Sequence, residues 1–201
     1  MFFDGYNTDG FHDELLVEGG EPRPHARLLC ETIDSLPAGE LLDYQESAER
    51  LFLQMGITFN VYGDVSGAER IFPFDLIPRI VPAAEWTWIE RGLQQRICAL
   101  NLFIDDIYHR QRILSDGVIP RGVIESAQSL RPQCVGMNPP RGVWCHVTGT
   151  DLVRDRDGQI YVLEDNLRVP SGVSYVLENR AVMKSTFPRL FEGMAIRPVD
   201  D

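Results

Sequence analysis

The sequence lacks the features that mark secreted, membrane-spanning and disulfide-stapled proteins. Its first residues, MFFDGYNTDG, contain no basic segment followed by a long apolar one, so we expect no signal peptide. No window is apolar over the roughly 20 residues that a bilayer-spanning helix needs. The four cysteines are scattered without a C-x-x-C pair, which favours reduced thiols and a cytoplasmic location. The adjacent Cys145 and His146 are only a weak indication of a zinc site.

Basic residues are also scarce. Lysine and arginine number 19 against 30 aspartates and glutamates, giving a formal net charge of −11. A surface this acidic repels a phosphate backbone, so we expect no broad nucleic-acid binding. A nucleotide held through a bound cation remains compatible with this charge, because the metal supplies the positive charge locally.

What is present indicates an ordinary globular chain with both helices and strands. The 201 residues are 44% hydrophobic and 24% charged, enough for one large domain or two small ones. Apolar periodicity, caps and turn residues predict helices over residues 25–35, 35–56, 85–115 and 177–190, and strands over residues 57–62, 143–163 (two strands) and 195–199. Three prolines make residues 69–82 an extended, packed segment with a short edge strand. The fold class is therefore α/β in the broad sense (α+β).

The helix predicted over residues 85–115 is the longest. Apolar residues recur along it at steps of three and four, which gives one continuous apolar face (Ile89, Leu93, Ile97, Leu100, Ile104 and Ile107). Near its end, four residues with chemically active side chains occur together (Asp105, Asp106, Tyr108 and His109). We expect these four to form a solvated helix face.

The segment between His146 and Tyr175 is the most informative. Asp157-Gly158 between two alternating runs predicts a two-residue hairpin loop. Asp151 lies six residues before Asp157 and Glu164 lies six residues after Gly158, so these two carboxylates would face each other across the ladder. Asn166, two residues beyond Glu164, would project from the same face.

Three oxygen-bearing side chains on one face form a ligand set that Mg²⁺ prefers, and a cation would relieve the repulsion between the two carboxylates. This prediction requires an even loop, because a three-residue loop would move Asp151 to the opposite face. Acidic residues also commonly decorate the solvated face of a hairpin without binding anything. A calcium-binding EF-hand loop is a second alternative that we reject, because position one is Val153 and strands replace the flanking helices.

The same segment resembles the metal-binding end of an ATP-grasp fold. The matching runs are DLVRDRDGQIYVLEDN and RVPSGVSY, and further resemblance lies in GITFNVYGD, ERIFPFDLIPRI, NLFIDDIY and LENRAVMK. Together they are similar to the circularly permuted ATP-grasp type 2 family, whose members resemble glutathionylspermidine synthetase. The resemblance assigns Asp151, Glu164 and Asn166 as ligands of the Mg²⁺ ions of ATP.

The resemblance also implies an activity. An ATP-dependent carboxylate–amine ligase forms an acylphosphate that an amine attacks, giving an amide or peptide bond, with ATP and Mg²⁺ as cofactors. Arg168 is the candidate catalytic residue for a phosphate or carboxylate, although a surface ion pair is an equal alternative. Ser171, Gly172 and Ser174 are the candidate cofactor-binding residues, with a plain turn as the alternative.

Family members are longer than this chain, so we expect an incomplete ATP-grasp fold, missing its C-terminal half and inactive alone. The expected organisation is an N-terminal mixed portion over residues 1–140 and the metal-binding hairpin with its following helix over residues 141–201. The expected partners are ATP and a small carboxylate, amine or peptide substrate, without nucleic acid or membrane. The alternative function is a metal- or nucleotide-binding scaffold without catalysis.

Overall fold

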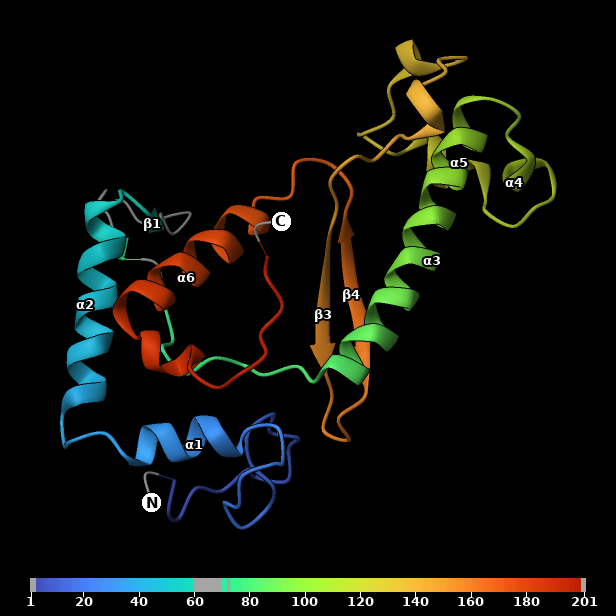
Figure 1. The fold of residues 1–201 in the computed structure, drawn as a ribbon. Helices are drawn as coiled ribbons and strands as arrows, with labels where there is room; N and C mark the ends of the chain where they lie inside the picture. The colour runs from blue at the N-terminus through green and yellow to red at the C-terminus, as the bar shows by residue number, and fades with distance from the viewer. Residues whose placement is uncertain (1–2, 60–69, 72, 200–201) are drawn as a thin grey trace. The chain divides into compact units, whose positions relative to one another are not determined.

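The computed structural model describes residues 3–59, 70–71 and 73–199. The chain divides into two compact units, which we describe separately (Figure 1). Unit 1 contains residues 1–82, 152–163 and 171–201, and unit 2 contains residues 83–151 and 164–170. The elements, in chain order, are α1 (Arg27–Asp34), α2 (Glu40–Gln54), β1 (Thr58–Phe59), β2 (Arg70–Ile71), α3 (Ala83–Tyr108), α4 (Arg112–Ser115), α5 (Arg121–Glu125), the 3-10 turns η1 (Pro132–Cys134) and η2 (Pro140–Gly142), β3 (Gly149–Arg154), β4 (Ile160–Asn166), α6 (Gly172–Thr186) and the 3-10 turn η3 (Pro188–Phe191).

The mixed helix-and-strand class is confirmed: the described residues combine helices with two small two-stranded sheets. The predicted organisation divides the sequence at residue 140 into two consecutive segments. The two compact units are each made of non-consecutive segments, so they do not test this division, and it stays a prediction.

Helices α1 and α2 lie where the apolar periodicity predicts them. The predicted start signal of the second helix is wrong, because Ser35 ends α1 and Gly39 precedes α2. Gly39 has φ 90°, a left-handed conformation that glycine adopts without the penalty a side chain imposes. The chain can therefore turn sharply between the two helices.

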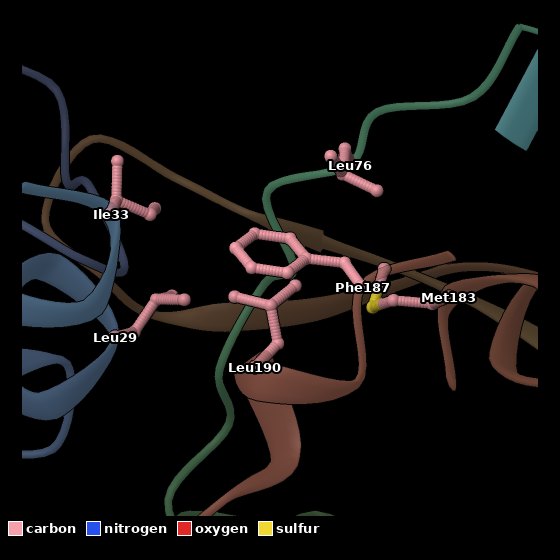
Figure 2. Close-up of a cluster of buried hydrophobic side chains, with 6 residues drawn as sticks. All are labelled: Leu29, Ile33, Leu76, Met183, Phe187 and Leu190. Atoms are coloured by element: carbon pink, nitrogen blue, oxygen red, sulfur yellow. The ribbon is translucent and has the colours of Figure 1, made fainter. Parts of the chain in front are cut away.

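A hydrophobic core holds unit 1 together (Figure 2). It joins α1, the extended segment after β2, the end of α6 and η3 through six buried side chains (Leu29, Ile33, Leu76, Met183, Phe187 and Leu190). Phe187 is fully buried and stacks on Tyr44 of α2, with ring centroids 4.4 Å apart. A second cluster packs α2 against α6 through Ala48, Phe52 and Val182.

The strands predicted in the first half are short. β1 and β2 pair antiparallel, with Thr58 opposite Ile71 and Phe59 opposite Arg70. The remainder of the strand predicted over residues 57–62, and parts of two resembling runs, lie outside the described residues.

Two arginines hold Glu14 in unit 1. The Nε of Arg154, on β3, donates to Glu14 Oε1 at 3.0 Å, and Arg79 forms a second ion pair with the same oxygen. Arg154 and Glu14 are largely buried, with side chains 8% and 16% exposed, whereas Arg79 is 74% exposed. Burial acts to raise the pKa of Glu14, but the hydrogen bonds from Arg79 and Arg154 outweigh it, so the pKa lies below its ordinary value.

Helix α3 is the longest element of unit 2. It begins at Ala83, two residues before the predicted start, and ends at Tyr108 rather than at residue 115. The break occurs at Gln111, which has φ 53° and precedes the separate helix α4. Asp106 stabilises the break, because its carboxylate accepts hydrogen bonds from the backbone N–H groups of Arg112 and Ile113 at 3.0 and 2.9 Å. These bonds, that of Ile113 first, lower the pKa of Asp106.

Three of the four residues expected on a solvated helix face instead hold the chain around the end of α3, whereas His109 is exposed as expected. Besides the cap formed by Asp106, Asp105 accepts a hydrogen bond from the indole of Trp144 at 3.1 Å. Tyr108 stacks on Trp144 with centroids 5.0 Å apart, and its hydroxyl accepts from the backbone N–H of Arg131. The prediction of a solvated face is wrong, because the distant segment around Trp144 packs here.

The second half of the chain differs from expectation at two further places. Helix α6 begins at Gly172, five residues before the predicted start, and Pro188 opens η3 where an interruption is predicted. No strand occurs over residues 195–199, so the strand predicted there is wrong. No helix in the described part of the chain is long and apolar enough to cross a membrane.

Candidate metal site

The hairpin of β3 and β4 forms where Asp157-Gly158 predicts it, but its loop is longer than predicted. The backbone N–H of Asp155 donates to the carbonyl of Gln159 at 2.9 Å, and that of Gly158 donates to the carbonyl of Asp155 at 3.0 Å. Three residues, Arg156 to Gly158, therefore lie between the facing pair. Gly158 has φ 83°, which completes a three-residue loop with a left-handed third position. The prediction of a two-residue loop is therefore wrong.

Asp155 organises this loop and is not free to act as a calcium ligand. Its Oδ1 accepts hydrogen bonds from the backbone N–H groups of Asp157 and Gln159, at 3.0 and 2.9 Å. Strands rather than helices flank the loop. Both observations agree with the rejection of the EF-hand alternative.

The open end of the hairpin has a different register. If the two strands continued from the facing pair Asp155 and Gln159 as a regular ladder, Thr150 would lie opposite Glu164. Instead, the Thr150 hydroxyl donates to Asp165 Oδ1 at 3.0 Å. A Cβ on Gly149 would lie 3.9 Å from the Cβ of Asn166, as expected of facing residues. β4 thus contains one residue more than β3 between the two ends, which is a β-bulge.

Burial along β4 shows where the extra residue lies. Exposure alternates regularly from Ile160 to Leu163, and then Leu163 and Glu164 are both exposed in succession. A bulge places two successive residues opposite one residue of the partner strand, and the register assigns Asp151 as that residue. The three-residue loop moves Asp151 away from the other two ligands, and the bulge restores it.

The exposed face of the open end therefore carries Asp151, Glu164 and Asn166 together, as predicted. All three side chains are exposed. Asn166 Nδ2 donates to Glu164 Oε1 at 2.9 Å, so these two side chains meet and the amide oxygen of Asn166 is not used in that bond. Two carboxylates and an amide oxygen fit the preference of Mg²⁺, which also takes water and phosphate oxygens as ligands.

No group of three His, Cys, Asp or Glu side chains that could hold a metal occurs within the described residues. The hairpin set contains only two such residues and is completed by an amide. The zinc site suggested by Cys145 and His146 finds no support in the described ranges, where all four cysteines are free thiols.

The opposite face of the open end is tied to α3. Arg96 Nε donates to Asp165 Oδ2 at 2.7 Å, while Thr150 occupies Oδ1 of the same carboxylate. The Asp165 side chain is 9% exposed. Asp165 lies between Glu164 and Asn166 in sequence and points to the other side of the sheet.

A second contact with α3 holds the chain before β3. Asn101 Oδ1 accepts hydrogen bonds from the backbone N–H groups of Trp144 and Cys145, at 2.8 and 3.1 Å. Neither the Arg96–Asp165 pair nor the Asn101 contacts are predicted from the sequence. Separations of 69, 43 and 44 residues give no local signal for them.

The segment after β4 contains the candidate Arg168. Its side chain is exposed, and it forms no hydrogen bond or ion pair within the described chain, which removes the surface-ion-pair alternative there. The next residue, Val169, has φ 50°, a conformation that a β-branched side chain rarely adopts. Pro170 then packs on Gly149, so that a Cβ at Gly149 would lie 2.9 Å from the Cβ of Pro170.

Ser171, Gly172 and Ser174 belong to unit 1, where they form the exposed start of α6. Ser171 is the N-cap but makes no side-chain capping bond. The backbone N–H of Ser174 donates to the carbonyl of Ser171 at 3.2 Å, whereas the N–H groups of Ser171 and Gly172 precede the first intrahelical bond, so the start of α6 offers these two donors to an anion.

A model of the circularly permuted ATP-grasp type 2 family matches residues 78–201, which include α3, the hairpin and α6. This chain belongs to that family.

Similar proteins occur in several bacteria. An uncharacterized protein of Synechocystis is 52% identical over 200 residues, covering all of this chain and 42% of that protein. An uncharacterized protein of Mycobacterium tuberculosis is 48% identical over 204 residues, covering 99% of this chain and 36% of that protein. A Frankia casuarinae protein provisionally named glutamate–cysteine ligase 2-2 is 41% identical over 197 residues, which cover 97% of this chain and 22% of that protein. The chain thus spans less than half the length of these relatives.

Proposed function

We propose that this chain provides the Mg²⁺-binding hairpin of an ATP-dependent carboxylate–amine ligase. The proposal is supported by the exposure of Asp151, Glu164 and Asn166 at the open end of one hairpin and by the hydrogen bond between Glu164 and Asn166, in a chain of the circularly permuted ATP-grasp type 2 family. Hairpin geometry and donor chemistry both support a hard cation at this face.

When bound, Mg²⁺ neutralises charge on the β- and γ-phosphates of ATP as the phosphoryl group moves. In this proposal Asp151 and Glu164 supply carboxylate ligands and Asn166 supplies an amide oxygen. Because these side chains stand on strands, the backbone ladder limits their movement. The acidic surface of the protein is then compatible with a nucleotide, because the cation separates the phosphates from the carboxylates.

Arg168 is proposed to bind a phosphate or a substrate carboxylate. Its planar guanidinium suits two-point contact with either group, and it is exposed without an intramolecular partner in the part of the chain that the structure describes. The start of α6 is proposed separately as a site for a phosphate or acyl oxygen. The N–H groups of Ser171 and Gly172 and the hydroxyl of Ser174 would be its donors.

The substrates are proposed only by class, as a small carboxylate and an amine or peptide. The Frankia relative's name mentions glutamate and cysteine, but the match covers 22% of that protein, so most of the named protein lies outside it. Glutamate and cysteine are therefore the first pair to try rather than an assignment.

Calorimetric titration of Mn²⁺ with ADP into the 201-residue chain tests the proposal. We expect saturable binding that Glu164→Gln abolishes and that Asp157→Asn, an exposed carboxylate change at the loop of the same hairpin, leaves intact. Binding that survives both Glu164→Gln and Asp151→Asn would contradict it. ADP release that requires both a carboxylate and an amine separates a ligase from a binding scaffold without catalysis.

A further inference from the structure

The register at the open end of the hairpin needs a physical cause. Asp151 and Glu164 face each other, and like charges directly opposed across a ladder repel when no cation joins them. The bulge that brings them together also disrupts the regular hydrogen bonding of β4. The apo hairpin must therefore contain contacts that favour this register over the regular one.

The side chain of Asp165 supplies such contacts. In a regular ladder continuing from the loop, Thr150 would face Glu164 and Asp165 would project from the exposed face, because a one-residue slip exchanges the two faces. The observed register instead directs Asp165 to the opposite side, where both of its oxygens are used. Oδ1 accepts from Thr150 at 3.0 Å and Oδ2 accepts from Arg96 at 2.7 Å.

The two hydrogen bonds of Asp165 favour the observed register of β4 over the regular one. With its side chain only 9% exposed, Asp165 would lose two charge-assisted hydrogen bonds, from Arg96 and from Thr150, if β4 slipped. Arg96 lies on the 26-residue helix α3, so its guanidinium approaches β4 from the side to which Asp165 points. Glu164, one residue earlier, would have to replace Asp165 there, which would remove it from the ligand face.

We propose that Asp165, held by Thr150 and Arg96, is a positioning residue that locks β4 in the register presenting Glu164 and Asn166 beside Asp151. The inference rests on the proposed function in assigning those three as metal ligands. Asp165 itself does not reach the ligand face. It acts through the backbone that it shares with its two neighbours.

The test compares Thr150→Val, which removes the hydroxyl at nearly constant shape, with Thr150→Ser, which keeps it, and with Asp165→Asn, which removes the charge. Two properties of the folded chain are measured: the cross-strand NOEs of the hairpin and the Mn²⁺ affinity. We expect Thr150→Val and Asp165→Asn to weaken the NOEs between positions 150 and 165, to add NOEs between positions 150 and 164, and to lower Mn²⁺ affinity about tenfold or more. Thr150→Ser should retain the wild-type values.

A purely structural role would lower the melting temperature while leaving NOEs and affinity unchanged, and that result would overturn the proposal. The register readout does not require metal. If the wild-type chain bound no Mn²⁺, the proposed function would fail, while unchanged NOEs in Thr150→Val and Asp165→Asn would separately overturn the register lock.

Discussion

Arg96 and Asp165 form an ion pair of 2.7 Å between the middle of α3 and the strand that carries two proposed metal ligands. Its Asp165 side is nearly buried, and Thr150 uses the remaining carboxylate oxygen. The ion pair therefore connects α3, which carries no proposed catalytic residue, to the strand that carries Glu164 and Asn166. Under the proposed function, a change on α3 would therefore alter metal binding without touching a proposed ligand.

Gly149 is required by the close approach of Pro170. Gly149→Ala places a Cβ 2.9 Å from the Cβ of a proline ring that cannot rotate away, so we expect a loss of about 1–3 kcal/mol in the free energy of unfolding. Urea denaturation measures this loss. The matched control is Gly172→Ala, where no atom lies within 4 Å of the added Cβ and stability should be unchanged or slightly higher. Equal stabilities for the two variants would contradict the predicted clash.

Glu14 should make folding pH-dependent. Its pKa is lowered in the folded state by Arg79 and Arg154, so its contribution is complete above the ordinary value of 4.5 and disappears as the pH falls through the lowered value. We expect Glu14→Gln to reduce unfolding free energy by about 1–3 kcal/mol at neutral pH, because Arg154 is left with an incomplete partner in a largely buried place.

The difference between wild type and Glu14→Gln should shrink as the pH falls below 4.5. Urea titrations at several pH values measure it, and Glu18→Gln, an exposed glutamate four residues away, is the control. A difference that stayed constant down to acidic pH would show that the carboxylate's charge is not responsible.

Phe187 anchors the core of unit 1. It is fully buried and stacks on Tyr44, so Phe187→Ala should lower the unfolding free energy by about 3–5 kcal/mol through lost contacts and a cavity. Leu42→Ala, at a side chain that is 62% exposed, should change it by no more than about 0.5 kcal/mol. Thermal and urea unfolding compare the two, and similar losses would show that the assigned core is wrong.

Asn101 should protect the chain that enters β3. Asn101→Leu removes the oxygen that accepts from the N–H groups of Trp144 and Cys145, so hydrogen exchange at both amides should accelerate about tenfold or more, the equivalent of one lost hydrogen bond. Asn101→Asp keeps an acceptor and should preserve most of the protection. Unchanged exchange in Asn101→Leu would mean that these bonds do not hold the segment in solution.

The sequence predicts the elements better than the contacts that shape the site. Apolar spacing locates α3, but not its end, because the left-handed Gln111 and the cap by Asp106 depend on side-chain geometry. Asp157-Gly158 locates the hairpin. The loop length is not predicted, because the same dipeptide suits a two-residue loop and the last two positions of a three-residue loop.

The prediction that Asp151 and Glu164 share one side of the hairpin contains two errors that compensate each other. A two-residue loop in a regular ladder and a three-residue loop followed by a bulge both place Asp151 and Glu164 on one side. The bulge is invisible to spacing, because it depends on contacts of Asp165 with Thr150 and with Arg96, 69 residues away. The resemblance to a known family implies the same three candidate ligands without depending on either loop.

The most direct test of the central claim is site-resolved NMR of the 201-residue chain during addition of Mn²⁺. Paramagnetic broadening identifies the residues nearest the bound ion. We predict that the signals of Asp151, Glu164 and Asn166 broaden first, and that Glu164→Gln abolishes this pattern while Asp157→Asn preserves it. Broadening centred elsewhere, or an unchanged pattern in Glu164→Gln, would contradict the assignment of this hairpin as the metal site.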